Sequence, residues 1–333
     1  MRLVQFISED GRRRVGLAGQ EGMTLQLLEG VEGVYGLAME AAERSEPLAT
    51  LIQDKLSNER ADYAAIIAGK RLLPPLDHPD PAHCHVTGTG LTHLGSAKAR
   101  DEMHVKSEDA GSEMTDSMRL FQWGLEGGKP GQGHVSVQPE WFYKGSGNAV
   151  VAPEQPLSLP PFALDGGEEA ELVGLYVVDK KGTPRRVGFA LGNEFSDHVM
   201  ERQNYLYLAH SKLRPCSFGP EILVGDLPRD IQGNVRILRN GEEIWAAPFL
   251  TGEENMAYAI GDLEHHHFKY AEFRRPGDVH CHFFGTATLS FSAGIAAQDG
   301  DIFEISAPAF GAALRNSVAR DGGTDELVHV ESL

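Results

Sequence analysis

The stretch EEAELVGLYVVDKKGTPRRVGFALGNEFS, residues 168–196, decides the fold of the larger part of this chain. It contains two apolar runs separated by the turn-forming residues 179–182 (DKKG), a pattern typical of a β-hairpin. Side chains alternate across a strand, so Glu169 and Glu171 project from one face, about 7 Å apart along the chain. If the second run returns antiparallel, Glu194 at its end comes back beside the start of the first.

Three carboxylates brought together in this way indicate a cation site. Oxygen-only ligands suit Mg²⁺, and also Mn²⁺ or Ca²⁺, because these hard cations prefer carboxylate and water to imidazole or thiolate. Glu-x-Glu is also common on solvated strand faces, so the motif alone does not separate a metal site from ordinary surface acids.

The remainder of the C-terminal half consists of further short β-like runs. NVRIL and EEIWAA flank Asn240-Gly241, which is the strongest short hairpin signal because both turn positions must accept positive φ. DVHCHFFG and DIFEIS follow. One helix is expected after Ser196, whose hydroxyl can cap it with Asp197 in the first turn. We therefore predict an α+β fold in which strands dominate this half.

The N-terminal part has a different pattern. Residues 37–67 are rich in Ala, Leu, Glu and Lys at helical spacing with a break at Pro47, which predicts a helical pair beside an opening strand. The proline-rich residues 72–83 make a natural linker. We therefore expect a small α/β domain over residues 1–75 and a larger domain over 76–333. Within the latter, the polar segment 97–138 suggests a lid, or equally an inert surface insertion.

Composition excludes several classes of protein. No run of about 18 apolar residues could cross a bilayer, and the N-terminus has no signal-peptide pattern. A formal net charge of -18 opposes binding to phosphate backbones, so we expect neither a nucleic-acid nor a membrane partner. Three widely spaced cysteines without CxxC spacing fit a reducing, cytoplasmic location, and Cys281 is expected in the core.

The run Glu264-His265-His266-His267 invites a zinc interpretation. Adjacent histidines on one segment point in different directions and cannot all reach one ion. We therefore favour surface or subunit-contact roles for them.

The order of motifs from residue 84 to 316 resembles the fumarylacetoacetate hydrolase superfamily. E-x-E on a strand is followed by Asn193-Glu194-Phe195-Ser196, similar to that family's N-D-x-S, and then by Ser211-Lys212, similar to its G-K motif. The later phrases SFGPEILVGD, PGDVHCHFFGTATLSF and DGDIFEISAPAFGAALRN continue the pattern in the same order. The resemblance implies a mixed β-roll or β-sandwich C-terminal domain, a homodimer and one divalent cation per subunit, held by Glu169, Glu171 and Glu194.

Two departures from the family pattern bear on the site. Glu194 stands where most members carry Asp, which lengthens that ligand by one methylene. The family's acid/base element, a His-x-x-Glu near the start of the large domain, is not reproduced in GTGLTHLGSAKARDEM, residues 88–103. His93 and Glu102 are the imidazole and carboxylate that this stretch offers for catalysis.

The phrases WFYKG, EHHHFKY and FFGTATLSF resemble the branch found in sugar-acid catabolic operons, which includes 2-keto-3-deoxypentonate dehydratases. That resemblance implies dehydration of a 2-keto-3-deoxy-pentonate to 2,5-dioxopentanoate through a metal-stabilised enolate. Lys212 would then hold the enolate or the polar tail of the 2-oxo sugar acid, Lys144 a further part of it, and Thr286 its carboxylate. The alternatives are hydrolysis of acylpyruvates or other 2,4-diketo acids at the same metal, and a non-catalytic sugar-acid binding protein.

Overall fold

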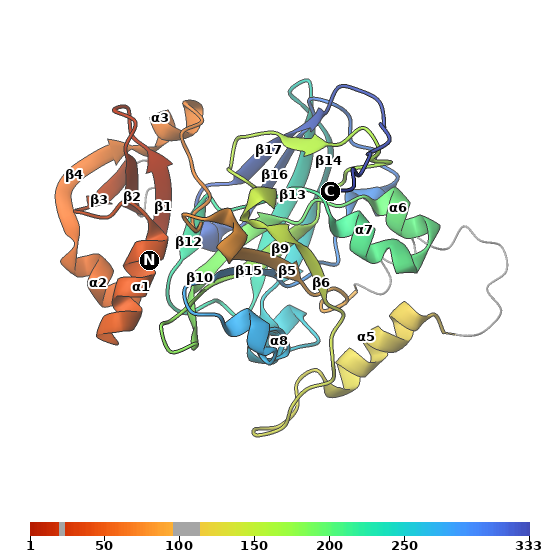
Figure 1. The fold of residues 1–333 in the computed structure, drawn as a ribbon, viewed down its shortest axis with the longest axis horizontal. Coiled ribbons are helices and arrows are strands. Elements are labelled where there is room, and N and C mark those ends of the chain that lie inside the picture. Colours follow the sequence, from red (N-terminus) through yellow and green to blue (C-terminus); the bar gives the residue numbers. More distant parts are fainter. Residues whose placement is uncertain (20–23, 96–113) are drawn as a thin grey trace.

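The computed structural model describes residues 1–19, 24–95 and 114–333. Two β-sheets form the body of the protein, with helices at its sides (Figure 1). The predicted α+β class is confirmed. Among the described residues no helix is long and apolar enough to cross a membrane.

The N-terminal unit is a four-stranded sheet covered by short helices (Figure 1). Its elements are β1 (Arg2–Ile7), β2 (Arg13–Ala18), β3 (Thr24–Leu28), α1 (Val34–Arg44), α2 (Leu48–Asp54), β4 (Leu56–Asp62) and α3 (Tyr63–Ala68). The helical pair predicted over residues 37–67 is therefore correct for α1 and α2, and residues 63–67 are also helical as part of α3, but residues 56–62 are not. Residues 56–62 pair with β3 as an exposed edge strand, because tertiary pairing overrides their helical composition.

The larger sheet has twelve strands among the described residues, in the order β4-β3-β2-β1-β12-β10-β9-β15-β5-β6; β11 also pairs with β10, and β7 pairs with β11. Its central strands are β9 (Ala170–Val178) and β10 (Pro184–Asn193), the predicted hairpin, with the turn over 179–182. The other strands of this part are β5 (Cys84–Gly88), β6 (Phe142–Ser146), β7 (Val150–Val151), β11 (Cys216–Phe218), β12 (Glu221–Leu223) and β15 (Val279–Phe283). Because β1 pairs with β12, one sheet spans both parts of the chain, and the domain division after residue 75 remains a proposal.

The smaller sheet has the order β14-β13-β16-β17-β8. Its strands are β8 (Leu157–Leu159), β13 (Ile231–Arg239), β14 (Glu242–Thr251), β16 (Ile302–Ser306) and β17 (Leu314–Arg320). The β13–β14 hairpin turns at Asn240 and Gly241, with φ of 54° and 85°, as predicted. Leu172 and Leu191 of the large sheet share an apolar cluster with Val235 of the small one, so the two sheets pack as a sandwich.

Four helices lie outside the N-terminal unit in the described part of the chain: α5 (Asp116–Gly127), α6 (His198–Gln203), α7 (Leu208–Lys212) and α8 (Ile260–Phe268). The helix expected after Ser196 is present as α6, but its cap is Asp197, whose carboxylate accepts from the Met200 N–H. The Ser196 hydroxyl donates instead to Glu194, 2.8 Å away.

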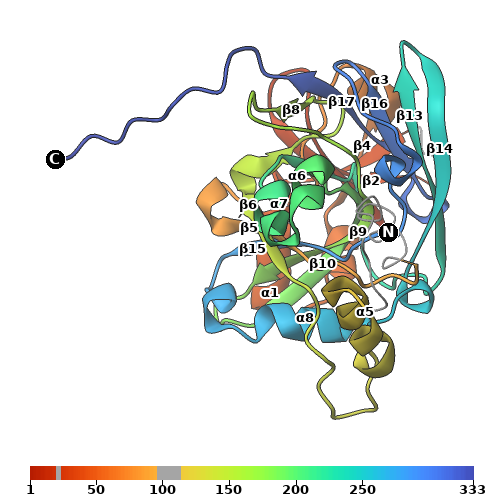
Figure 2. The same ribbon diagram turned by 90° about the vertical axis from the view of Figure 1, so that its right-hand side faces the viewer.

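The segment interpreted as a lid, 97–138, lies partly outside the described residues, which resume at 114. Its described part forms α5 and an irregular stretch that packs beside α8, where Ser136 contacts His266 at 3.0 Å (Figure 2). Figure 2 also shows the chain end, residues 321–333, extending away from the body. Whether any of the segment 97–138 closes over a site remains a proposal.

Candidate metal centre

The three carboxylates of the predicted cation site lie together where the β9–β10 hairpin ends. Asn193 pairs with Ala170, and the Glu194 N–H donates to the Glu169 carbonyl at 3.0 Å, so the register returns Glu194 beside Glu169. Glu169, Glu171 and Glu194 each offer a carboxylate oxygen within 4.8 Å of the others. They are 8%, 1% and 0% exposed, so these are not ordinary surface acids.

Lys212, at the end of α7, lies between two of these carboxylates. Its Nζ is 2.5 Å from Glu169 Oε1 and 2.5 Å from Glu194 Oε2. It also donates to the Ser196 hydroxyl at 3.1 Å. A buried ammonium group in this position neutralises carboxylates that burial would otherwise prevent from ionising.

Lys144, on β6, approaches Glu194 from the other side. Its Nζ donates to Glu194 Oε1 at 2.6 Å and to the carbonyls of Phe195 and Lys212 at 2.7 and 3.0 Å. The side chain is fully buried, so Lys144 is not a solvated surface cation. Because two of its three partners are backbone carbonyls, the Lys144 ammonium group has a fixed position and in turn positions Glu194.

The electrostatics of the cluster differ from one carboxylate to the next. Burial opposes ionisation of Glu169, yet Lys212 and His198 hold its pKa well below the usual range. Burial, added to the charges of Glu169 and Glu194, raises the pKa of Glu171 well above it. Burial also raises the pKa of Glu194, against the opposing effect of Lys144. Glu171 is thus the carboxylate whose ionisation would gain most from a cation.

His198 is a member of this cluster that the sequence analysis did not identify. Its Nε2 lies 3.1 Å from Glu169 Oε1, and its Nδ1 lies 3.9 Å from Asp165. Burial works against protonation, but Glu169 and Asp165 raise the pKa of the imidazole above its usual value. The only sequence signal was its place just after the capping residue Asp197, which is too common to indicate a site.

The end of β15 supplies the other wall of the site. The Gly285 N–H donates to Glu171 Oε2 at 2.7 Å. Gly285 has a φ of 87°, and a Cβ here would lie 2.5 Å from the Thr92 hydroxyl, so glycine is required. Thr286 follows it, half-buried, and its hydroxyl accepts from the Thr288 N–H at 3.2 Å.

Glu168 is a further buried carboxylate, next in sequence to Glu169. Its two oxygens accept from the backbone N–H and the hydroxyl of Ser290, at 2.9 and 2.6 Å. Burial raises its pKa. These bonds connect the segment before β9 to the loop after β15, so Glu168 stabilises the backbone around the site.

His93 lies behind Gly285, where its Nδ1 is 3.7 Å from the place a Gly285 Cβ would take. It is 1% exposed, and its ring nitrogens lie 3.0 and 2.8 Å from the hydroxyls of Thr92 and Thr251. Burial lowers its pKa to about 3, so the ring is neutral at physiological pH. Glu102, the second acid/base residue predicted from the sequence, lies outside the described residues.

The donor set fits a hard divalent cation. Three carboxylates converge. Lys212 donates to those of Glu169 and Glu194, and the Gly285 N–H donates to that of Glu171. Mg²⁺ binds through carboxylates and retained waters in such sites. A bound dication would relieve the repulsion that raises the pKa of Glu171.

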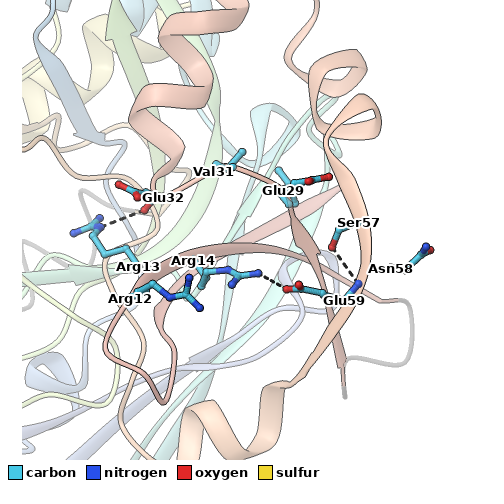
Figure 3. A pocket seen from close by; sticks show the side chains of 11 residues that line it. Arg12, Arg13, Arg14, Glu29, Val31, Glu32, Ser57, Asn58 and Glu59 are labelled. Atoms are coloured by element: carbon cyan, nitrogen blue, oxygen red, sulfur yellow. Dashed lines mark hydrogen bonds and ion pairs between the residues drawn. The ribbon is translucent and has the colours of Figure 1, made fainter.

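A separate cavity of about 630 Å³ opens in the N-terminal unit (Figure 3). Three consecutive arginines line it, a composition that could suggest an anion site. Each already pairs with a carboxylate: Arg12 with Asp10, Arg13 with Asp77 and Arg14 with Glu59. The cavity also has acidic walls and shares no residue with the carboxylate centre, so we assign it no ligand.

The histidine run after Glu264 is arranged differently from the prediction. His266 and His267 are 3% and 1% exposed, so a surface role is wrong for both. They do point to different partners, since His266 contacts Ser136 and His267 contacts His280. The amphipathic spacing of α8 turns these two histidines toward the sheet.

No family model and no curated protein matches this sequence. Solved structures do share its fold over nearly the whole chain. A hexagonal crystal form of 2-keto-3-deoxyarabinonate dehydratase has a TM-score of 0.71 at 20% identity, covering 97% of this chain and 100% of that one. The chain shares its fold with that structure, in agreement with the fumarylacetoacetate hydrolase type of fold that the motif order implied.

Two further structures place this likeness within a wider group. 2-Keto-3-deoxy-D-arabinonate dehydratase complexed with magnesium and 2,5-dioxopentanoate has a TM-score of 0.69 at 20% identity, covering 96% of this chain and 99% of that one. 5-Carboxymethyl-2-hydroxymuconate delta-isomerase from Mycobacterium smegmatis has a TM-score of 0.58 at 19% identity, covering 97% and 100%. At this level of identity the likeness establishes the fold, and the reaction must be argued from the site.

Proposed function

We propose that this protein is a metal-dependent dehydratase of 2-keto-3-deoxy sugar acids, converting a 2-keto-3-deoxy-pentonate to 2,5-dioxopentanoate and water. The observation that carries the proposal is the buried convergence of Glu169, Glu171 and Glu194 around Lys212. The magnesium and 2,5-dioxopentanoate named for a solved structure of the same fold support it. A homodimer and a cytoplasmic location stay predictions.

In this proposal the three carboxylates hold one divalent cation, with Mg²⁺ expected and Mn²⁺ or Ca²⁺ as alternatives. When bound, the cation supplies Lewis-acid polarisation of the 2-oxo group of the substrate. Glu194 is the ligand that departs from the family pattern. Its extra methylene fits, because Lys144 and Lys212 hold its two oxygens separately.

Lys212 is the residue proposed to stabilise negative charge on the substrate. Dehydration removes a proton from C3 and expels the C4 hydroxyl as water, and the resulting unsaturated alcohol rearranges to the terminal aldehyde. Charge accumulates on the C2 oxygen when the C3 proton leaves. An ammonium group in a buried site stabilises such charge far better than water does. Lys144 would then keep Glu194 in place while Lys212 turns toward the substrate.

His93 and Glu102 remain the residues proposed for proton transfer, with Thr286 proposed to hold the substrate carboxylate. The ring of His93 is neutral throughout the physiological range, the form that can accept a proton, although the burial that lowers its pKa to about 3 also makes it a weaker base than a free imidazole. Thr286 follows Gly285, whose N–H donates to Glu171, and this neighbouring position in the chain supports its proposed role. The lid proposed for 97–138 would exclude water from these groups.

The test is an assay of Mg²⁺-loaded protein with 2-keto-3-deoxy-pentonates of both C4 configurations, following 2,5-dioxopentanoate. Glu171→Gln, which removes one ligand, should abolish turnover and bound Mg²⁺ together. Turnover of acylpyruvates to pyruvate instead would favour the hydrolase alternative at the same metal. Binding of sugar acids without any turnover would favour the non-catalytic alternative.

A further inference from the structure

A second group of potential metal ligands lies at the opposite end of β15 from Gly285. His280 on β15 and His85 on β5 are direct partners in adjacent parallel strands, so their side chains share one face of the sheet. The two rings stack with centroids 4.9 Å apart. β15 and β5 lie side by side near the β6 edge of the large sheet, above α8 (Figure 1).

Asp278, immediately before β15, completes the group. Its carboxylate is fully buried, with Oδ2 3.2 Å from His85 Nε2 and Oδ1 2.8 Å from His83 Nδ1. His85, Asp278 and His280 each offer a ligand atom within 4.8 Å of the others. His83 holds the carboxylate oxygen that His85 does not, which orients Asp278 as an outer partner orients a metal ligand.

An unpartnered nitrogen points to a ligand at this group. His280 is 0% exposed, yet its Nε2 has no hydrogen-bond partner among the described residues. Its other nitrogen, Nδ1, lies 2.9 Å from His267 Nε2. A buried histidine with one nitrogen held by a neighbouring side chain and the other unused is the arrangement that metal-binding histidines adopt.

We propose that His85, Asp278 and His280 form a second cation site, specific for a borderline transition metal of the Zn²⁺ type. Two imidazoles and one carboxylate suit Zn²⁺, whereas Mg²⁺ prefers oxygen ligands throughout. The group opens to solvent through His85, whose side chain is 18% exposed, so a water can take the fourth position. The site joins β5, β15 and the turn before β15.

This site is separate from the carboxylate centre. Asp278 precedes β15 and Gly285, which holds Glu171, follows it, so the two lie at opposite ends of a 5-residue strand that is about 16 Å long. The donor types differ as well, which makes the two sites separable by choice of metal. The second site therefore does not depend on the proposed reaction.

Arg275 competes with a cation for Asp278. Its Nε lies 3.1 and 3.0 Å from the two oxygens of Asp278. The Arg275 side chain is 54% exposed, so it can withdraw into solvent when a metal binds. Removal of Arg275 should strengthen metal binding, an effect opposite in sign to that of general damage to the fold.

Trp141 reports on the same event. Its indole N–H donates to His267 Nδ1 at 3.3 Å, which leaves His267 to donate from Nε2 to His280 Nδ1. With a metal on Nε2, His280 carries its proton on Nδ1 and becomes the donor, so the direction of this bond reverses. A neutral His267 then bears its proton on Nδ1, and Trp141 turns toward water, since it is only partly buried.

The experiment titrates metal-stripped protein with Zn²⁺ in a large excess of Mg²⁺, by calorimetry and by the fluorescence of Trp141 against a Trp141→Phe blank. We expect one Zn²⁺ per chain. His85→Gln and His280→Gln should each weaken binding by tenfold to a hundredfold or more, and Arg275→Gln should tighten it. Anomalous scattering at the zinc edge from crystals of the wild-type protein should place the ion between His85 and His280.

The matched control is His282→Gln, because His282 is buried on the same face of β15 and its Nε2 also has no partner among the described residues, yet it is not one of the three grouped ligands. It should bind Zn²⁺ like the wild type, as should Glu171→Gln. The proposal is overturned if the wild type binds no Zn²⁺ beside Mg²⁺, or if Glu171→Gln abolishes zinc binding while His85→Gln leaves it intact. If His280→Gln does not fold, the Zn²⁺ affinity of His85→Gln still tests the proposal, because His85 is partly exposed.

Discussion

The backbone N–H of Gly285 donates to Glu171 Oε2 over 2.7 Å and joins the end of β15 to the start of β9. Glu171 is therefore held by a neutral donor, whereas Glu169 and Glu194 accept from Lys212. Burial and the two neighbouring carboxylates raise the pKa of Glu171 well above its usual range. In the metal-free protein this residue opposes folding at neutral pH.

Replacing Glu171 with Gln should therefore stabilise the metal-free protein while abolishing its metal binding. Because the folded-state pKa of Glu171 is raised, its protonated form contributes stability that is complete below about pH 4.5. This contribution is lost as the pH rises toward the folded-state pKa. We therefore expect the unfolding free energy of the metal-free variant at pH 7 to exceed that of the wild type. Thermal unfolding in chelator, with and without added Mg²⁺, measures both effects.

Glu169→Gln is the matched control and should have the opposite effect. The pKa of Glu169 is held well below its usual range, so its ionised form contributes stability above about 4.5 that is lost as pH falls. The metal-free variant should be less stable than the wild type at pH 7. Equal effects of Glu169→Gln and Glu171→Gln would contradict the electrostatic description of the centre.

Lys212→Met should make the stability of the protein depend on metal. Its removal leaves Glu169 and Glu194 buried without the ammonium group that lies 2.5 Å from each. Loss of one partner from a buried ion pair costs about 3–5 kcal/mol. We expect a lower melting temperature in chelator, a larger rise on adding Mg²⁺ than in the wild type, and loss of turnover.

The control for Lys212→Met is Lys144→Met. Lys144 contacts Glu194 and two carbonyls but not Glu169, so its loss should destabilise the protein with less recovery on adding Mg²⁺. A Mg²⁺-dependent rise of the same size in both variants and in the wild type would show that Lys212 is not the charge that a cation replaces.

Glu194→Asp tests the residue that departs from the family pattern. The change restores the more common side chain, yet it withdraws the carboxylate from Lys144, Lys212 and Ser196, all of which now reach it. Weakened hydrogen bonds to a buried charge cost about 1–3 kcal/mol. We expect lower stability and weaker Mg²⁺ binding, measured by unfolding and calorimetry; unchanged stability and metal affinity would show that the extra methylene of Glu194 is not needed at this centre.

The hairpin and its carboxylates could be predicted from the sequence because strand alternation and turn chemistry are local. A side-chain period of two predicts that Glu169 and Glu171 share a face, and the turn residues 179–182 predict the hairpin. The antiparallel register then places Glu194 beside them. Lys212 was predicted only from the order of motifs, because it lies on the separate short helix α7, whose position relative to the hairpin no periodicity describes.

The residues that the sequence did not predict are those whose roles depend on distant contacts. His198 reaches Glu169 across 29 positions, and the Gly285 N–H reaches Glu171 across 114. β4 was taken for helix because its composition favours helix, but β3 offered it an unpaired edge. The burial of His266 and His267 was not predicted, because three adjacent histidines do not indicate which face of a short helix is buried.

His93 makes the protein sensitive to acid in a defined range of pH. Burial lowers its pKa to about 3, so the stability contributed by the neutral ring is complete above about 6.5 and is lost as pH falls toward 3. About 2 kcal/mol of unfolding free energy should be lost through this residue between pH 6.5 and 5. Denaturant unfolding at pH 7 and pH 5 should therefore show a smaller loss in His93→Gln than in the wild type.

His134→Gln is the control for this comparison, because His134 is exposed and its replacement should leave the difference between the two pH values unchanged. The same variants test the catalytic proposal. If His93 accepts the C3 proton, His93→Gln should lower kcat by about 10²–10⁴ with bound Mg²⁺ retained. A variant with normal kcat and reduced acid sensitivity would assign His93 to the frame of the site, where its bonds to Thr92 and Thr251 support the Gly285 turn that holds Glu171.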